Sequence, residues 1–174
     1  ERLVIRPSWE EYDNKDNRVV LSIDPGAAFG TGTHATTRMC LGLLERFVYP
    51  DCTLLDIGSG SGILSIASVL LGAKHADGVD IDPVAVKVAD ENAEMNDISD
   101  KVSYIKGDLC DKISNRYDVV CANIVADVII RMAPDIGRYM AENGVLIVSG
   151  IIEERAEEVV SVLHANGFTV EDFR

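Results

Sequence analysis

Long hydrophobic runs are missing from this chain of 174 residues. No apolar run approaches the roughly 18 residues that a membrane-spanning helix needs, and no secretory signal peptide is visible. We therefore expect a cytoplasmic protein with no membrane partner. Hydrophobic residues still make up 47% of the chain, enough to form the core of one domain without disulfides or structural metals.

Cysteine is scarce, and its spacing excludes the usual structural metal motifs. The four cysteines form no C-x-x-C pair, and no H-x-x-x-H motif accompanies them. They are Cys40, Cys52, Cys110 and Cys121. Each has apolar neighbours in the sequence, as is typical of buried free thiols in a reducing cytosol. The sequence predicts no metal site.

Basic residues are in deficit. The chain has 16 lysines and arginines against 29 acidic residues, a formal net charge of −13. Proteins that bind nucleic acid usually carry the opposite sign, so we expect no direct contact with nucleic acid. A negative surface attracts basic proteins, but the same charge also serves solubility. The composition alone leaves both interpretations open.

A regular alternation of strands and helices follows residue 50. Strands are expected at 53–57, 76–79, 102–105, 117–122 and 145–149, and helices at 63–71, 83–95, 126–140 and 153–165. The strands are almost continuous apolar runs, which is typical of strands covered on both faces by helices. Such alternation predicts parallel strands joined by right-handed crossovers. The fold class is therefore α/β, a Rossmann-like, doubly wound, mostly parallel sheet with helices on both faces.

The two ends of the chain are less regular. Residues 1–17 are polar and 19–23 form a short strand candidate, so we interpret 1–23 as a linker or edge segment and 24–174 as the domain. A helix over 36–47 follows from its apolar spacing. Residues 168–170 are expected to begin a sixth strand, and the strand that would close the sheet is expected to be missing.

A glycine-rich turn, D-I-G-S-G-S-G at 56–62, follows a predicted strand and opens a predicted helix. Glycines there permit a tight turn, close approach of a ligand and close packing of helix on strand. The dinucleotide motif G-x-G-x-x-G would require glycine where Ile63 stands, and no G-K-S/T is present, which excludes a P-loop. A tight turn without a ligand is the alternative interpretation.

Two further acids follow the next strands. Asp80 ends the second strand, 22 positions after Gly58, where an acid can accept hydrogen bonds from both hydroxyls of a ribose. Asp108 follows the third strand, where an acid commonly reaches an adenine amino group. Each acid can instead be a turn residue. Their position at successive strand ends predicts a ligand site there, because open α/β sheets bind ligands at that edge.

The turn D-x-G-x-G-x-G resembles the first motif of the class I methyltransferases. The segment D-P-G-A-A-F-G-T-G-T-H-A-T-T at 24–37 and the strand end V-V-C-A-N-I-V-A at 119–126 further resemble the ribosomal protein L11 methyltransferase family. Ala35 stands where that family usually has proline. The family also carries a separate N-terminal recognition domain, for which 174 residues leave no room. The chain is thus expected to be a catalytic-domain fragment or a short relative with another substrate.

The resemblance implies S-adenosylmethionine as cofactor and N-methylation of lysine or N-terminal amines of a basic ribosomal protein. It places Asp56 near the cofactor's amino group and Asn123 near the transferred methyl, where Asn123 is the candidate catalytic residue. The cofactor-binding candidates are Thr37, Asp56, Gly58, Gly60, Gly62, Asp80, Asp108 and Asn123. Phe29 and His34 are further candidates, expected to close over the cofactor.

Several of these residues can instead have a purely structural role. Thr37 can simply cap a helix, His34 can be an exposed turn residue, and Asn123 can be a strand-end turn residue. Three other functions also fit the sequence. They are a class I methyltransferase acting on another protein or a small molecule, a nicotinamide-dinucleotide-binding domain, and a non-catalytic cofactor-binding module.

Overall fold

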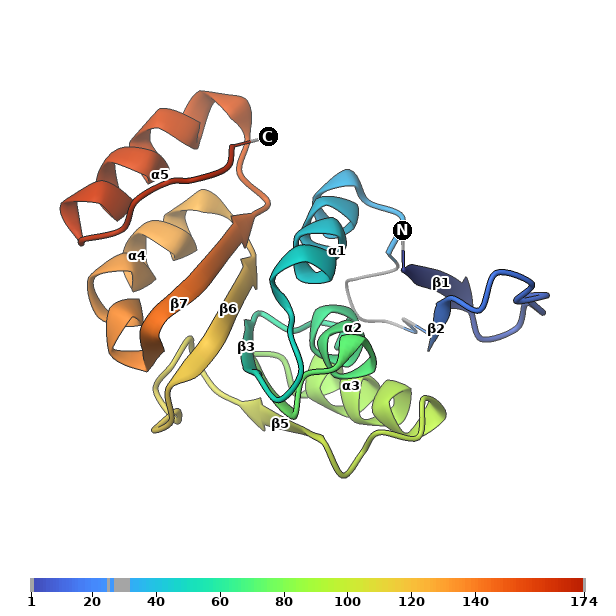
Figure 1. Ribbon diagram of the computed structural model, residues 1–174. Helices are drawn as coiled ribbons and strands as arrows, with labels where there is room; N and C mark the ends of the chain where they lie inside the picture. The colour runs from blue at the N-terminus through green and yellow to red at the C-terminus, as the bar shows by residue number, and fades with distance from the viewer. Residues whose placement is uncertain (1, 25, 27–31, 174) are drawn as a thin grey trace.

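A five-stranded, fully parallel sheet forms the centre of the molecule in the computed structural model, which describes residues 2–24, 26 and 32–173 (Figure 1). Its strands are β3 (Thr53–Ile57), β4 (His75–Asp80), β5 (Val102–Lys106), β6 (Tyr117–Asn123) and β7 (Met140–Ser149). Their order is β5-β4-β3-β6-β7. The sheet therefore begins with β3 in its middle and grows outward on one side through β4 and β5. The chain then returns to add β6 and β7 on the other side of β3, so the strand order reverses between β3 and β6, although all strands stay parallel. That reversal is the place where sheets of this kind bind ligands.

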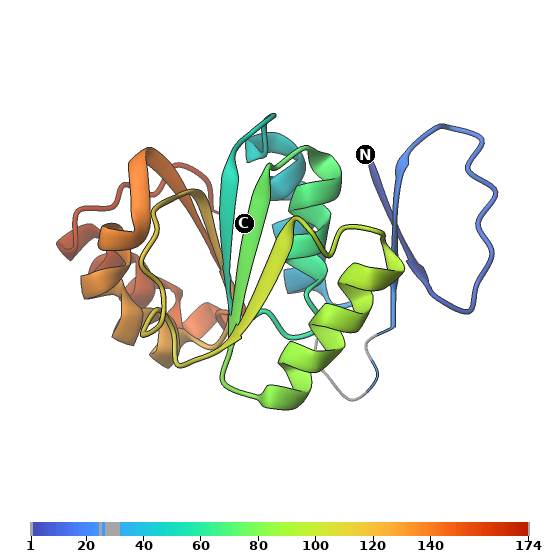
Figure 2. The same cartoon turned by 90° about the horizontal axis from the view of Figure 1, so that it is seen from below.

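Helices cover both faces of this sheet (Figure 2). One face carries α1 (Ala35–Phe47), α2 (Ile63–Leu71) and α3 (Pro83–Met95), and the other carries α4 (Ala126–Ile136) and α5 (Glu153–Ala165). The predicted Rossmann-like, doubly wound fold is confirmed. In the described part of the chain, no helix combines the length and the apolar character that crossing a bilayer requires.

The apolar core is split into two layers by the sheet. Neighbouring residues of a strand point to opposite faces, and β3 shows the consequence directly. Leu54 is buried with Leu44 of α1 in one layer, whereas Leu55 is buried with Ile129 of α4 in the other. This two-sided burial explains the continuous apolar run in the middle of β6, where residues 119–122 are all buried.

A second, two-stranded parallel sheet packs outside α2 and α3. It pairs β1 (Leu3–Pro7) with β2 (Val19–Ile23). The strand at 19–23 is confirmed, and Leu21 and Ile23 are fully buried in the core layer of α1 and α2. The polar composition of residues 1–17 did not predict β1. Only Leu3 of this strand is buried, and the strand exists through its pairing with β2.

Two predicted boundaries near the C-terminus differ from the structure. The helix predicted to reach residue 140 ends at Ile136, and a single 3₁₀ turn, Gly137–Tyr139, leads directly into β7. The sixth strand predicted at 168–170 is wrong. The backbone N–H of Phe168 is instead bonded to Leu163 O as α5 ends, and Asp172 accepts a hydrogen bond from Arg46 of α1 at 3.2 Å. Among the described residues no strand pairs with this segment, and an extended segment forms a strand only by pairing.

Gly62 offers a test of how tightly the sheet and its helices pack. Its φ of +79° is left-handed, and a Cβ there would lie 2.5 Å from Tyr104 Oη and 3.0 Å from Ala89 Cβ. We expect Gly62→Ala to lower the free energy of unfolding by about 2–3 kcal/mol in urea titrations. Gly42→Ala is the control. Gly42 is exposed in α1, and a Cβ added there would meet no other atom within 4 Å, so this change should raise stability by about 0.5–1 kcal/mol. Equal effects would contradict this account.

Candidate functional site

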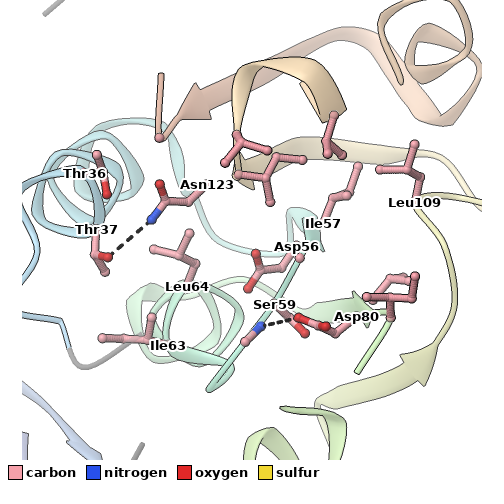
Figure 3. A pocket seen from close by; sticks show the side chains of 18 of the residues that line it. Thr36, Thr37, Asp56, Ile57, Ser59, Ile63, Leu64, Asp80, Leu109 and Asn123 are labelled. Carbon is pink, nitrogen blue, oxygen red and sulfur yellow. Dashed lines mark hydrogen bonds between the residues drawn. The ribbon is translucent and has the colours of Figure 1, made fainter. Parts of the chain in front are cut away.

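A pocket of about 1100 Å³ opens at the carboxyl ends of the parallel strands, where the sheet reverses direction (Figure 3). Its floor is the glycine-rich turn after β3. One wall comes from the start of α1 and the end of β6, and the other from the ends of β4 and β5. The pocket therefore collects side chains from segments that are far apart in the sequence, as ligand sites of open α/β sheets do.

The glycine turn is tied to the end of β4 by backbone hydrogen bonds. Gly58 N and Ser59 N both donate to Val79 O, at 2.8 and 3.1 Å. Gly60 N donates to Asp80 Oδ2 at 2.9 Å, the contact drawn as a dashed line in Figure 3. The turn also approaches β6 closely, because a Cβ on Gly58 would lie 2.5 Å from Ile124 Cγ2. The pocket floor is thus held from two sides.

Asp80 is held in one orientation by two backbone donors. One carboxylate oxygen accepts from Gly60 N, and the other accepts from Asp82 N at 2.9 Å. Each carboxylate oxygen has a second acceptor position, and Asp80 lines the pocket. It therefore keeps the capacity to accept hydrogen bonds from ligand hydroxyls. Asp82 caps α3 by accepting a hydrogen bond from Val84 N at 2.8 Å.

Asp56 is a buried acid on the floor of the pocket. Only 1% of its surface is exposed, and Oδ2 accepts a hydrogen bond from Ser65 N at 3.1 Å. Burial raises the pKa of its carboxyl group to about 7, and the nearby charge of Asp80 adds to the rise, although hydrogen bonds from Ser65 oppose it. A cation in the pocket would stabilise the ionised carboxylate.

The opposite wall joins Asn123 at the end of β6 to the first turn of α1. Asn123 Nδ2 donates to the hydroxyl of Thr37 at 3.3 Å, and Figure 3 shows the two side chains pointing toward each other. Thr37 is buried, whereas His34 is the N-cap of α1 and accepts from Thr36 N at 3.3 Å. His34 is exposed and caps the helix, a role that the sequence had suggested for Thr37 instead.

Asp108 lies at the outer rim of the pocket and is already paired. Arg131 of α4 binds its carboxylate with two nitrogens, at 2.7 and 3.2 Å. Arg131 could not be predicted from the sequence, because this pairing joins α4 to the segment after β5, 23 residues earlier in the chain. Apolar side chains line the same region, namely Ile81, Leu109, Val125 and Val128.

Ser59 is a second pocket residue that sequence reasoning missed. Its side chain is 5% exposed, and its hydroxyl oxygen has no hydrogen-bond partner among the residues that the structure describes. A buried hydroxyl without a partner is costly, and a ligand in the pocket would relieve this cost. The residue occupies the variable position between the first two glycines of the motif, which carries no chemical signal in a single sequence.

Most of the predicted site residues meet at this pocket. Those that line it are His34, Thr37, Asp56, Gly58, Gly60, Asp80, Asp108 and Asn123. Gly62 does not line it, because this glycine starts α2 and faces Tyr104 and Ala89 on the side away from the cavity. Phe29 lies outside the described residues. The contacts of these residues with a cofactor stay a prediction.

Known proteins similar to this chain decide its family. The model of the family "Ribosomal protein L11 methyltransferase (PrmA)" matches residues 1–174. The chain belongs to this family. It is 50% identical over 171 residues to a ribosomal protein L11 methyltransferase of Heliobacterium modesticaldum and 51% identical over 169 residues to that of Pelotomaculum thermopropionicum. These matches cover 98% and 97% of the chain, but 54% and 55% of the relatives, so the chain spans about half of their length.

A solved structure agrees with this assignment. The ribosomal protein L11 methylase of Lactobacillus delbrueckii subsp. bulgaricus superposes with a TM-score of 0.91 at 33% identity, covering 98% of this chain and 87% of that one. A precorrin-6y methyltransferase of Geobacter metallireducens, at 16% identity and a TM-score of 0.70, shares the fold. The predicted family resemblance is confirmed.

The buried Asp56 predicts a specific dependence of stability on pH. Because its folded pKa of about 7 lies above the ordinary value of 3.8, the folded chain holds a proton that the unfolded chain releases between these values. This carboxyl therefore lowers stability as pH rises from about 4 to 7, by on the order of 4 kcal/mol in total. We expect Asp56→Asn to be more stable relative to the parent chain at pH 8 than at pH 4, measured by urea unfolding. A stability difference that is the same at both pH values would show that this carboxyl is not perturbed.

Proposed function

We propose that the chain binds S-adenosylmethionine and transfers its methyl group to lysine or N-terminal amines of a ribosomal protein of the L11 type. The observation that carries this proposal is the pocket between Asp80 and Asn123, whose floor is the D-x-G-x-G-x-G turn. Membership of the family, whose relatives are named ribosomal protein L11 methyltransferases, supports the reaction class and the substrate.

The groups that line the pocket fit the chemistry of this cofactor. Asp80 has acceptor capacity for ribose hydroxyls, and Asp56 has a carboxyl that a cationic amino group would ionise. Ser59 offers a buried hydroxyl without a partner among the described residues. The apolar rim of Ile81 and Leu109 suits an adenine ring. S-adenosylmethionine carries no phosphate, in keeping with the absence of a P-loop.

Bound S-adenosylmethionine supplies the electrophilic methyl group, and the residues of the chain align the amine that attacks it. We assign the alignment to Asn123, whose side-chain oxygen accepts a hydrogen bond from the amine while its nitrogen is held by Thr37. Alignment of this kind is worth about 7–11 kcal/mol of the barrier.

The amine must be neutral when it attacks. An ordinary lysine has a pKa of about 10.4, and the apolar side chains of Leu64 and Ile124 beside Asn123 lower it by excluding water. His34 is committed to the helix cap at the edge of the pocket, so we assign the released proton to bulk water rather than to a residue of the chain.

The expected partner is a basic protein and the expected compartment is the cytoplasm. The net charge of −13 favours a positively charged substrate over direct binding to nucleic acid. All four cysteines are free and buried, which suits a reducing compartment. Transfer of labelled methyl from S-adenosylmethionine to a ribosomal-protein fraction, compared with a panel of small amines, tests the substrate class. Methylation of the small amines alone would favour a small-molecule methyltransferase.

Variants of two neighbouring acids separate cofactor binding from helix capping. Asp80→Ala should weaken binding of S-adenosylhomocysteine about 100-fold in calorimetry, because it removes charged acceptors from the ligand and the glycine turn. Asp82→Ala is the matched control. It removes the cap of α3 at a cost of about 1 kcal/mol but no pocket contact, so affinity should be unchanged. Equal loss of affinity in both variants would count against a binding role for Asp80.

Asn123→Ala should separate turnover from binding. We expect most of the methyl transfer to be lost at saturating cofactor, with the affinity for S-adenosylhomocysteine within a few-fold of the parent chain, because Asn123 is assigned to the amine rather than to the nucleoside. The measurement is a methyl-transfer assay paired with calorimetry. Undiminished turnover would remove Asn123 from the active site.

A further inference from the structure

Side chains along one face of α3 and at its C-terminal cap contact the end of β2 and the residues that follow it. Asn96 accepts from Ser22 N at 2.9 Å and donates to Ser22 O at 2.7 Å. One turn earlier, Asn92 Oδ1 accepts from Asp24 N at 2.9 Å. Each asparagine thus replaces a strand partner for this extended backbone.

These contacts continue for another turn of α3. Val88 Cγ2 lies 3.8 Å from the position that a Cβ on Gly26 would occupy. Helix positions 96, 92 and 88 therefore face Ser22, Asp24 and Gly26 in turn.

Asn92 differs from the other residues on this face because it also reaches the glycine turn. Its Nδ2 donates to Ser61 O at 2.9 Å, and the side chain is only 1% exposed. One buried amide thus joins the floor of the pocket to Asp24. Asp24 is the residue that directly follows β2. Among the described residues, the side chain of Asn96, one turn further along, makes no hydrogen bond to the glycine turn; it bonds to Ser22 and to Asn92 O of the helix.

We propose that Asn92 is a positioning residue for the cofactor pocket, a role that rests on the proposed function. Its amide fixes the direction of the Ser61 carbonyl within the turn whose Gly60 N–H binds Asp80. The same amide bonds to the backbone of Asp24, so the glycine turn and the end of β2 are held relative to each other before a ligand arrives. Removing it leaves one backbone N–H and one carbonyl without their buried partner, which the pocket would accommodate by shifting.

The test compares Asn92→Ala with its neighbour Asn96→Ala. Both variants lose hydrogen bonds to the end of β2 or to the residue after it, and both should lose thermal stability. Only Asn92→Ala should weaken binding of S-adenosylhomocysteine, by about tenfold in calorimetry, with Asn96→Ala within twofold of the parent chain. In methyl transfer, Asn92→Ala should raise KM for the cofactor and leave kcat at saturation unchanged, a split that mere destabilisation does not produce.

A measurement on the parent chain covers the case in which the alanine variant fails to fold. Because Asn92 links the turn to Asp24, adding S-adenosylhomocysteine should slow hydrogen exchange of the Asp24 amide at least as strongly as that of Gly60 N–H, measured by NMR. Unchanged exchange at Asp24, unchanged affinity in Asn92→Ala, or equal affinity loss in both variants would overturn the proposal. If the parent chain itself binds no S-adenosylhomocysteine, the proposed function fails, and the role of Asn92 falls with it.

Discussion

The tie between the glycine turn and the end of β4 is the interaction on which the site depends. Val79 O and the Asp80 carboxylate together accept hydrogen bonds from three consecutive backbone N–H groups, those of residues 58–60. The turn can take this path only because its glycines adopt left-handed conformations. The result is a rigid floor under the pocket, placed at the reversal of the sheet. The remaining site residues are arranged around this floor by the strands that neighbour β3.

The pocket combines two different electrostatic environments over a short stretch of backbone. Asp80 is ordered by backbone donors and keeps free acceptor positions, whereas Asp56 is buried and its carboxyl has a pKa raised to about 7. A ligand that carries both hydroxyls and a cationic amine satisfies both acids at once. On the other wall, the amide of Asn123 is oriented by Thr37. Under the proposed function, cofactor recognition lies on the β4 side and the reacting groups on the β6 side of the sheet.

Much of this arrangement could be predicted from the sequence, and the reasons differ between elements. The strand at 53–57 and the helix at 63–71 were predicted at their observed bounds, because the apolar run and the glycines are local signals. Strand β1 was missed, and the prediction of a strand at 168–170 was wrong. Both errors arise because a strand forms only with a partner strand elsewhere in the chain. Asp80 and Asn123 were found because strand ends mark the ligand edge of such sheets. Arg131 and Asn92 were not, because their contacts join segments that are distant in the chain, and Ser59 was not, because its burial beside the pocket leaves no signal in a single sequence.

The central claim is that this pocket is built for a sulfonium nucleoside and not for a dinucleotide. Calorimetric titration of the chain with S-adenosylmethionine, and separately with NAD, tests it most directly. The account predicts saturable binding of one S-adenosylmethionine per chain and no heat of binding with NAD. Saturable binding of NAD together with no response to S-adenosylmethionine would contradict it.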